Sequence, residues 1–211
     1  GYINAALQTG FQNSLDQAIL EANHDSPSNF TKLDEIPYDF NRKILSIAAL
    51  VEDKKLLISK GALENILSLC TNAPIEKQKL FSRAETFYAE GFRVLGIASK
   101  LLDKSIVQKS DESDLHFDGF LLFYDPIKED GPQTLQHLKD LGIRLVMITG
   151  DHPVIASYVG KKSGFTRTEC LVQSDIKELS EDKLFKALES YDIFARIEPL
   201  EKARLIETFK K

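Results

Sequence analysis

The triplet Thr149-Gly150-Asp151 ends a largely apolar run, residues 144–148, and its groups are suited to binding a phosphate or a metal ion. An apolar strand of this kind places the residues that follow it at the carboxyl end of a sheet, where open α/β folds bind their ligands. Gly150 lets the backbone approach a phosphate, Thr149 can donate a hydrogen bond, and Asp151 can accept one or bind through a metal ion. The same residue types are common in ordinary turns, so the triplet alone does not establish a site.

Further motifs accompany this triplet in a fixed order. They are Phe40-x-Arg42, Ser59-Lys60-Gly61-Ala62, Gly91-Phe92-Arg93-Val94-Leu95, Asp125-Pro126-x-Lys128, and Phe194-Ala195-Arg196-Ile197-Glu198-Pro199 followed by Lys202. In order and spacing they resemble the signatures of the P-type ATPases, which are ATP-driven ion pumps. The resemblance covers nearly the whole chain. It implies a nucleotide-binding domain followed by part of a phosphorylation domain with the haloacid-dehalogenase fold.

In the second half, the resemblance implies a site for the ATP phosphates and Mg²⁺. Thr149, Gly150 and Asp151 correspond to the family loop that meets these groups. Lys202 corresponds to the lysine at the phosphorylation site, although its place on a helix would also suit a solvated lysine. Arg196 matches an arginine near the ribose, with a surface ion pair as the alternative. Asp125 is expected to support binding of the nucleotide and Mg²⁺.

In the first half, the resemblance implies a pocket for ATP or ADP. An adenine needs an aromatic or apolar slot, and its phosphates need cations nearby. Phe40 lies in the polar stretch 39–42, which suits an exposed platform for the adenine, although a core position is the commoner role of a phenylalanine. Arg42 is expected to steer the phosphates, and Lys60 to reach the nucleotide from deep in the pocket.

Four more residues of this half match family contacts. Gly61 permits close approach of the nucleotide, while Arg93 and Leu95 match contacts to the phosphates and the base. Asp16 is expected either to hold the adenine amino group or to act only as a favourable acid near a helix start.

Within the family, residues 2–21 and 34–43 look most like the bacterial magnesium-importing P-type ATPases, and the resemblance implies ATP and Mg²⁺ as cofactors. The family's phosphorylated sequence, Asp-Lys-Thr-Gly-Thr, is nowhere in the chain. Without that nucleophile, the chain is expected to bind nucleotide without turnover. One alternative is a free-standing phosphatase of the haloacid-dehalogenase type, which would require an Asp-x-Asp pair after an early strand, and none is present. Another is a non-catalytic nucleotide-binding module.

The composition restricts the classes of partner. The 27 basic and 32 acidic residues give a net charge of −5, which argues against a nucleic-acid or membrane-surface role. No apolar run is longer than the one over residues 120–124, which is far shorter than the roughly 20 residues of a membrane helix. The four histidines show no metal-ligand spacing with each other or with Cys70 and Cys170, so no metal site made by the chain alone is predicted. The two cysteines are expected to be small buried residues in a reducing cytosol.

The chain begins at Gly1, without an initiator Met or a signal peptide. We therefore expect a piece of a longer polypeptide, whose membrane and actuator domains would be its partners. The resemblance implies a location at the cytoplasmic face of the bacterial inner membrane, with no membrane insertion of this segment itself.

The pattern of apolar residues predicts an α/β protein with two domains, residues 1–119 and 120–211. For the first, we expect an antiparallel sheet with helices. A capping box at Ser14 opens a helix over 14–23, and a loop over 23–29 follows. Next we expect a hairpin of strands 44–51 and 55–59, helices over 61–70 and 78–90, a strand over 92–98 and a surface excursion over 100–114. For the second, we expect a partial doubly wound parallel sheet with strands 120–124, 145–148 and 193–195 and helices 132–141, 153–162, 181–190 and 199–209.

Overall fold

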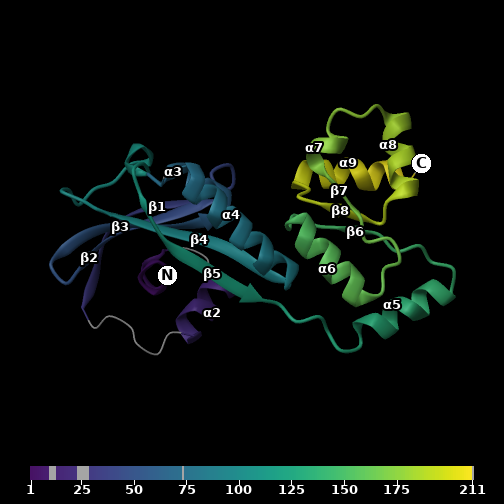
Figure 1. Cartoon of the computed structure of the whole chain (residues 1–211), viewed down its shortest axis with the longest axis horizontal. Helices are drawn as coiled ribbons and strands as arrows, with labels where there is room; N and C mark the ends of the chain where they lie inside the picture. Colours follow the sequence, from purple (N-terminus) through teal and green to yellow (C-terminus); the bar gives the residue numbers. More distant parts are fainter. Residues whose placement is uncertain (10–12, 23–28, 73, 211) are drawn as a thin grey trace. The chain divides into compact units, whose positions relative to one another are not determined.

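The computed structural model describes residues 1–9, 13–22, 29–72 and 74–210 of the chain (Figure 1). The chain divides into two compact units. The first unit comprises Gly1–Arg83 and Val94–Phe123, and the second comprises Ala84–Arg93 and Tyr124–Lys211. Apart from Asn29, the loop predicted over 23–29 lies outside the described residues.

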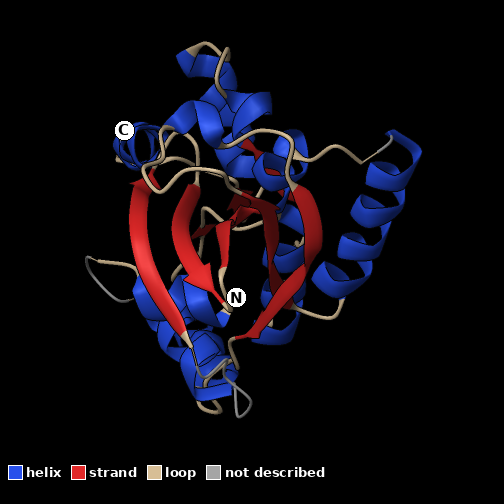
Figure 2. Cartoon of the chain, turned by 90° about the vertical axis from the view of Figure 1, so that its left-hand side faces the viewer, coloured by secondary structure: helices blue, strands red, loops and turns tan. Residues whose placement is uncertain are grey.

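The first unit is built on a five-stranded sheet in which the strands follow one another in sequence order, β1-β2-β3-β4-β5. Strands β1 to β4 pair antiparallel, and Figure 2 shows the strands side by side. The elements that make up this part of the chain are α1 (Tyr2–Leu7), α2 (Ser14–Ala22), β1 (Phe30–Asp39), β2 (Ile44–Val51), β3 (Lys54–Ala62), α3 (Leu63–Leu69), α4 (Pro74–Ala89), β4 (Phe92–Leu101), the 3₁₀ turn η1 (Lys109–Asp111) and β5 (His116–Tyr124). The last residues of α4, the first two of β4 and the last of β5 belong to the second unit.

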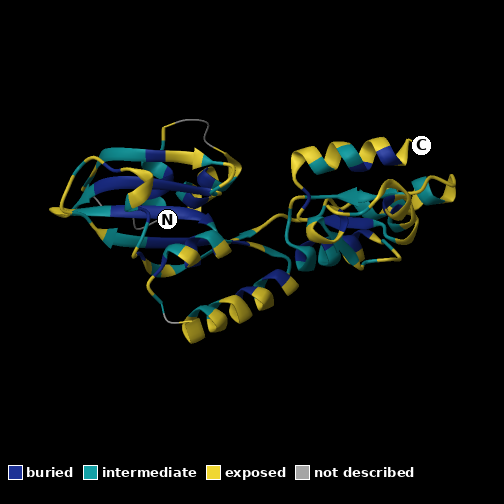
Figure 3. Ribbon diagram, turned by 90° about the horizontal axis from the view of Figure 1, so that it is seen from above, coloured by how far each residue is buried: buried dark blue, intermediate teal, exposed yellow. Residues whose placement is uncertain are grey.

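Strand β2 is buried on both faces, because successive side chains of a strand point to opposite sides of the sheet. On one face, Ile44 and Ala48 join a core that includes Ile66 of α3. On the other face, Leu45 and Ile47 pack with apolar residues of α1. Figure 3 shows buried positions along the strands of this sheet. This packing on both faces places β2, and with it the residues at its ends, against α1 and α3.

The predicted hairpin of β2 and β3 is confirmed. Its two-residue loop consists of Glu52 and Asp53, with φ of 47° and 66°. Positive φ at both loop residues gives the strand twist that tight hairpins require. The register pairs Val51 with Lys54 at the loop and Ile44 with Gly61 at the other end.

The second unit contains a small parallel sheet of order β6-β8-β7. Its core includes the fully buried side chains of Phe194, Leu184 and Leu205. The elements are α5 (Gly131–Asp140), β6 (Met147–Ile148), α6 (Pro153–Ser163), β7 (Cys170–Val172), α7 (Gln173–Ile176), α8 (Glu181–Ser190), β8 (Ile193–Ala195) and α9 (Pro199–Phe209). An antiparallel sheet with helices followed by a small parallel sheet confirms the predicted fold class.

Several predicted elements need correction. The strand over 120–124 is not part of the parallel sheet, because β5 lies beside β4 in the first one. The helix predicted over 61–70 begins at Leu63, because Gly61 continues β3 and pairs with β2. The helix predicted over 78–90 begins earlier, at Pro74. At α2 the capping acceptor is Asn13, whose Oδ1 accepts from the amide of Asp16 at 2.9 Å, so Ser14 is a helical residue and not the cap.

Two strands and two short helices were not predicted from the sequence: β1, β7, α1 and α7. The segment 100–114, predicted as a surface excursion, is partly buried and partly helical. It contains η1, and Val107 and Glu112 are both buried.

Candidate functional site

Asp16 and Lys60 form a buried ion pair in the first unit. Their side chains are only 1% and 8% exposed, respectively. The Lys60 Nζ bonds Asp16 Oδ1, while Asp16 Oδ2 accepts from Gln8 Nε2 at 2.6 Å. Each charge therefore has a partner inside the protein, as buried charges require. The two residues are 44 positions apart in sequence, and both are predicted nucleotide contacts.

The predicted nucleotide contacts on β3 and β4 lie next to this pair. Gly61 and Ala62 follow Lys60 and pair with Gly96 and Leu95 of β4. The amide of Ala62 donates to the carbonyl of Lys43 at 3.0 Å, so the end of the β1–β2 connection lies beside Gly61. A Cβ on Gly61 would lie 2.3 Å from that carbonyl oxygen. The carbonyl of Lys43 thus occupies the space that a side chain at position 61 would need.

Phe40 lies in the connection between β1 and β2, which we call the Phe40 turn (residues 39–43). The residue is 86% exposed, and its ring meets the ring of Tyr38 edge-on, with centroids 5.4 Å apart. Asp39 Oδ1 accepts from the amides of Asn41 at 2.8 Å and Arg42 at 3.1 Å, which closes the turn. These amides, the Arg42 amide first, together with the ammonium of a nearby lysine, lower the pKa of Asp39 to about 2.

Arg42 is bound within the protein. Its Nη1 bonds the carboxylate of Glu112 and its Nη2 donates to the carbonyl of Pro37 at 2.9 Å. Glu112 Oε1 also accepts from Ser46 Oγ at 2.7 Å. Sequence reasoning did not identify Glu112 or Gln8. Glu112 lies in a polar stretch that predicts an exposed loop, and no periodic pattern distinguishes a buried carboxylate there.

In the second unit, the Thr149-Gly150-Asp151 loop is joined to the end of β8. The Thr149 amide donates to the Phe194 carbonyl at 2.9 Å, and the Arg196 amide donates to the Asp151 carbonyl at 3.0 Å. The Ile197 amide in turn donates to the Thr149 carbonyl at 3.0 Å. Arg196 has φ of 54°, which is uncommon for a residue with a side chain. The motifs that begin at Thr149 and at Phe194 are 45 residues apart in sequence, and these main-chain hydrogen bonds join them side by side.

Asp151 is the carboxylate of this loop, and it is half-buried. Its Oδ2 accepts from Thr149 Oγ1 at 2.9 Å, and its Oδ1 accepts from Arg93 Nη2 at 2.6 Å within the second unit. Among the described residues there is no group of three or more His, Cys, Asp or Glu side chains that could hold a metal ion. A single carboxylate with a neighbouring hydroxyl fits Mg²⁺ only when the ion also takes ligands from water and substrate phosphates, which is its usual mode of binding.

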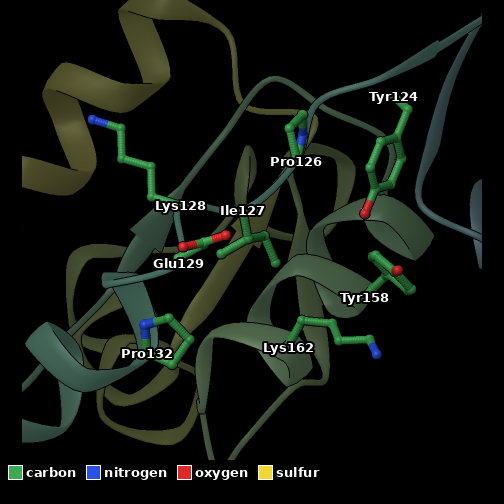
Figure 4. A pocket seen from close by; sticks show the side chains of 8 residues that line it. All are labelled: Tyr124, Pro126, Ile127, Lys128, Glu129, Pro132, Tyr158 and Lys162. Carbon is green, nitrogen blue, oxygen red and sulfur yellow. The ribbon is translucent and has the colours of Figure 1, made fainter.

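Lys202 and Asp125 are both exposed. Lys202 lies in the first turn of α9, where its amide donates to the carbonyl of Glu198 at 2.9 Å. Asp125 lies in the segment between β5 and α5. A cavity of about 260 Å³ lies along that segment, and Figure 4 shows the side chains that line it. They are Tyr124, Pro126, Ile127, Lys128, Glu129, Pro132, Tyr158 and Lys162.

The two cysteines are free thiols. Cys70 is buried and Cys170 is half-buried, and burial raises the pKa of both. Both thiols are therefore kept protonated and unreactive at neutral pH. Within the described ranges, none of the helices is both long and apolar enough to span a bilayer.

Comparison with known proteins gives a family match and a set of relatives. Residues 3–130 match the family model described as "P-type ATPase, cytoplasmic domain N". The chain is 33% identical to the "Magnesium-transporting ATPase, P-type 1" of Escherichia coli K12 over 228 aligned positions, which cover all of this chain and 25% of that protein. It is also 33% identical to the protein of that name from Salmonella typhimurium strain 14028s, with the same coverage.

A more distant relative carries a different ion in its name. The chain is 27% identical to the "Calcium-transporting ATPase 1" of Bacillus cereus strain ATCC 10987, over 98% of this chain and 24% of that protein. The chain thus spans about a quarter of the length of the curated relatives that it matches.

Proposed function

Because this chain belongs to the P-type ATPase family, with its first part matching the cytoplasmic domain N, we propose that it is the ATP-binding portion of a cation-translocating ATPase of the magnesium-transporting kind. In this proposal the first unit binds the nucleotide and the second contributes the loop that meets its phosphates and Mg²⁺. The rest of the polypeptide, with its membrane and actuator domains, is the partner of both, and the site of action is the cytoplasmic face of the bacterial inner membrane.

The observation that carries the proposal is the convergence of four separate segments at one end of the first sheet. Lys60 forms an ion pair with Asp16, and the carbonyl of Lys43 accepts from the amide of Ala62, the residue after Gly61. Ala62 on β3 also pairs with Leu95 on β4. An exposed aromatic ring, Phe40, stands on the same connection, so a planar base can stack there.

Each residue has a role in this proposal. Phe40 stacks on the adenine, and Asp16 accepts from its amino group while the ion pair with Lys60 holds that carboxylate in place. Leu95 supplies apolar contact to the base. Gly61 keeps the strand close to the Phe40 turn.

In the second unit, Thr149 and the amide of Gly150 donate to phosphate oxygens. Asp151 would hold Mg²⁺, and the cation would supply charge neutralisation at the phosphates. Arg196 lies on the neighbouring loop for the ribose, and Lys202 and Arg93 supply positive charge. Asp125 supports the same binding from the segment before α5.

The proposal is tested by titrating the protein with ATP and with ADP, observed by NMR. Phe40→Ala is expected to weaken binding by about 1–3 kcal/mol, because stacking of a base on an aromatic ring has that magnitude. Phe81→Ala is the matched control, since Phe81 is also partly exposed but lies on α4 and contributes to none of the four segments. An absence of shifts near Phe40 and Lys60 at millimolar nucleotide would refute the proposal.

We also propose that the 211-residue chain alone has no ATPase or phosphatase turnover. Its sequence holds no Asp-Lys-Thr-Gly-Thr, so the attacking aspartate is missing. Incubation with γ-labelled ATP followed by acid quenching is expected to leave the protein unlabelled. Acid-stable label on any aspartate of the chain would contradict this expectation.

A further inference from the structure

Residues 107–112, which we call the clamp segment, run beside β1 and the Phe40 turn and contact them at three successive points. The Val107 amide donates to Asp34 Oδ2 at 2.8 Å on β1. Lys109 Nζ lies 3.0 Å from Asp39 Oδ2 at the start of the turn. The third contact is the ion pair between Glu112 and Arg42. The clamp segment therefore runs alongside the end of β1 and the Phe40 turn, and its contacts follow in the same order along both segments.

Glu112 is buried and hydrogen-bonded to strand β2 of the sheet. Its side chain is only 3% exposed. Besides Arg42, it accepts from Ser46 Oγ of β2, and that hydroxyl lies 2.7 Å from Ser59 Oγ of β3. A carboxylate buried to this extent is stable only with its partners in place. It therefore fixes the position of Arg42 relative to the two central strands.

The exposed ring of Phe40 depends on this arrangement. Beyond its edge contact with Tyr38, the ring is surrounded by solvent, so packing does little to fix its orientation. The backbone of the turn must then set that orientation. The turn is held at one end by Asp39, which contacts Lys109, and at the other by Arg42, which contacts Glu112.

We propose that the clamp segment, through Glu112 and Lys109, positions the Phe40 turn for nucleotide binding. This inference rests on the function proposed above, and it also gives Arg42 a different task. Arg42 acts chiefly by linking Phe40 to Glu112, and Glu112 is a positioning residue that touches no nucleotide. Holding the ring in its binding orientation before the nucleotide arrives removes part of the ordering cost of binding.

The chain contains no tryptophan, so Phe40→Trp introduces a single fluorescent reporter at the turn. Time-resolved anisotropy of that reporter, without nucleotide, measures how freely the ring moves. Glu112→Gln keeps the shape of the side chain and its contact with Ser46 but removes the charge that holds Arg42. It is expected to increase the fast motion of the reporter. Lys109→Gln is the second variant, and at 65% side-chain exposure it leaves the buried core untouched.

Nucleotide affinity is measured separately, in proteins that keep Phe40, by calorimetry with ADP and with Mg²⁺ and ATP. Both variants are expected to lower affinity about two- to tenfold, the equivalent of ordering one side chain. The matched control is Lys104→Gln, which breaks the ion pair that Lys104 makes with Asp111 of the clamp segment, a pair that includes no residue of the Phe40 turn. It is expected to change neither the motion of the reporter nor the affinity.

The outcomes separate the two proposals. Greater reporter motion together with weaker binding in Glu112→Gln and Lys109→Gln supports the positioning role. Unchanged reporter motion overturns it, and so does greater motion with unchanged affinity, which leaves the nucleotide site itself intact. If Glu112→Gln does not fold, Lys109→Gln decides by the same criteria. If the unaltered protein binds neither nucleotide, the proposed function fails first, and the positioning role falls with it.

Discussion

Replacing Lys60 with methionine should destabilise the first unit strongly. The change keeps an unbranched side chain of similar length but removes the positive charge, leaving the carboxylate of Asp16 in a site where it is 1% exposed. The remaining hydrogen bond from Gln8 is a neutral donor and does not compensate the charge. Removing one partner of a buried ion pair typically costs about 3–5 kcal/mol. That is a large share of the roughly 5–15 kcal/mol by which a domain is stable.

The double variant Asp16→Asn with Lys60→Met gives the sharper result. It removes both buried charges and leaves an amide that can still accept from Gln8. We expect it to recover most of the stability lost in Lys60→Met, because replacing a whole buried pair is often nearly neutral. Adding the single variant Asp16→Asn completes a double-mutant cycle, in which the effect of the double variant minus the sum of the two single effects gives the pairwise term.

Urea unfolding at pH 7, followed through backbone amide signals of β2 by NMR, reports on the first unit separately. Lys104→Met serves as the control, because the pair of Lys104 with Asp111 has a lysine that is 47% exposed and should contribute less than about 1 kcal/mol. A loss in Lys60→Met no larger than in this control would refute the reasoning. So would a double variant that is no more stable than Lys60→Met.

Two further changes test the turn and the strand beside it. Gly61→Ala should cost about 1–3 kcal/mol in urea unfolding, because its Cβ would lie 2.3 Å from the carbonyl oxygen of Lys43, and a backbone group cannot move aside cheaply; a loss below about 0.5 kcal/mol would contradict this. Asp39→Asn should change the acid stability. The pKa of Asp39 falls from an ordinary 3.8 to about 2 on folding, so its charge stabilises the protein above the ordinary value, and this contribution disappears as the pH falls toward 2. The free energy of unfolding should therefore fall less between pH 5 and pH 2 for Asp39→Asn than for the unaltered protein. An equal fall in both proteins would count against the assignment.

Local sequence signals predicted the elements that depend on local chemistry. The hairpin at Glu52 and Asp53 follows from two alternating apolar runs around a short polar break. Helices α6 and α9 begin with a proline at their first position, and the sequence predicts both starts. Strand β1 escaped prediction because it is an edge strand with a proline and several acids, which are features that protect an edge from pairing but also hide the strand.

Non-local contacts account for what the sequence could not give. The run over 120–124 has the length and apolarity of a buried strand in either kind of sheet, and only pairing with β4 decides between them. The exposure of Phe40 follows from its polar neighbours and agrees with the structure. No local pattern, however, links Asp16 to Lys60 or Arg42 to Glu112, because each pair is closed by the folding of strands far apart in the chain.

The strand order of the second unit has a consequence for how the protein acquires its shape. In the first sheet each strand lies beside its predecessor, so pairing can proceed strand by strand as the chain is made. In the second, β8 comes last in sequence among the described strands yet lies between β6 and β7, so neither has a neighbour until it arrives. Contacts over such long sequence separations are slow to form. The conformation of Thr149, Gly150 and Asp151, with three main-chain bonds to residues 194–197, should therefore be among the last features to appear during synthesis, and a ribosome-bound chain ending before Ile193 should lack it.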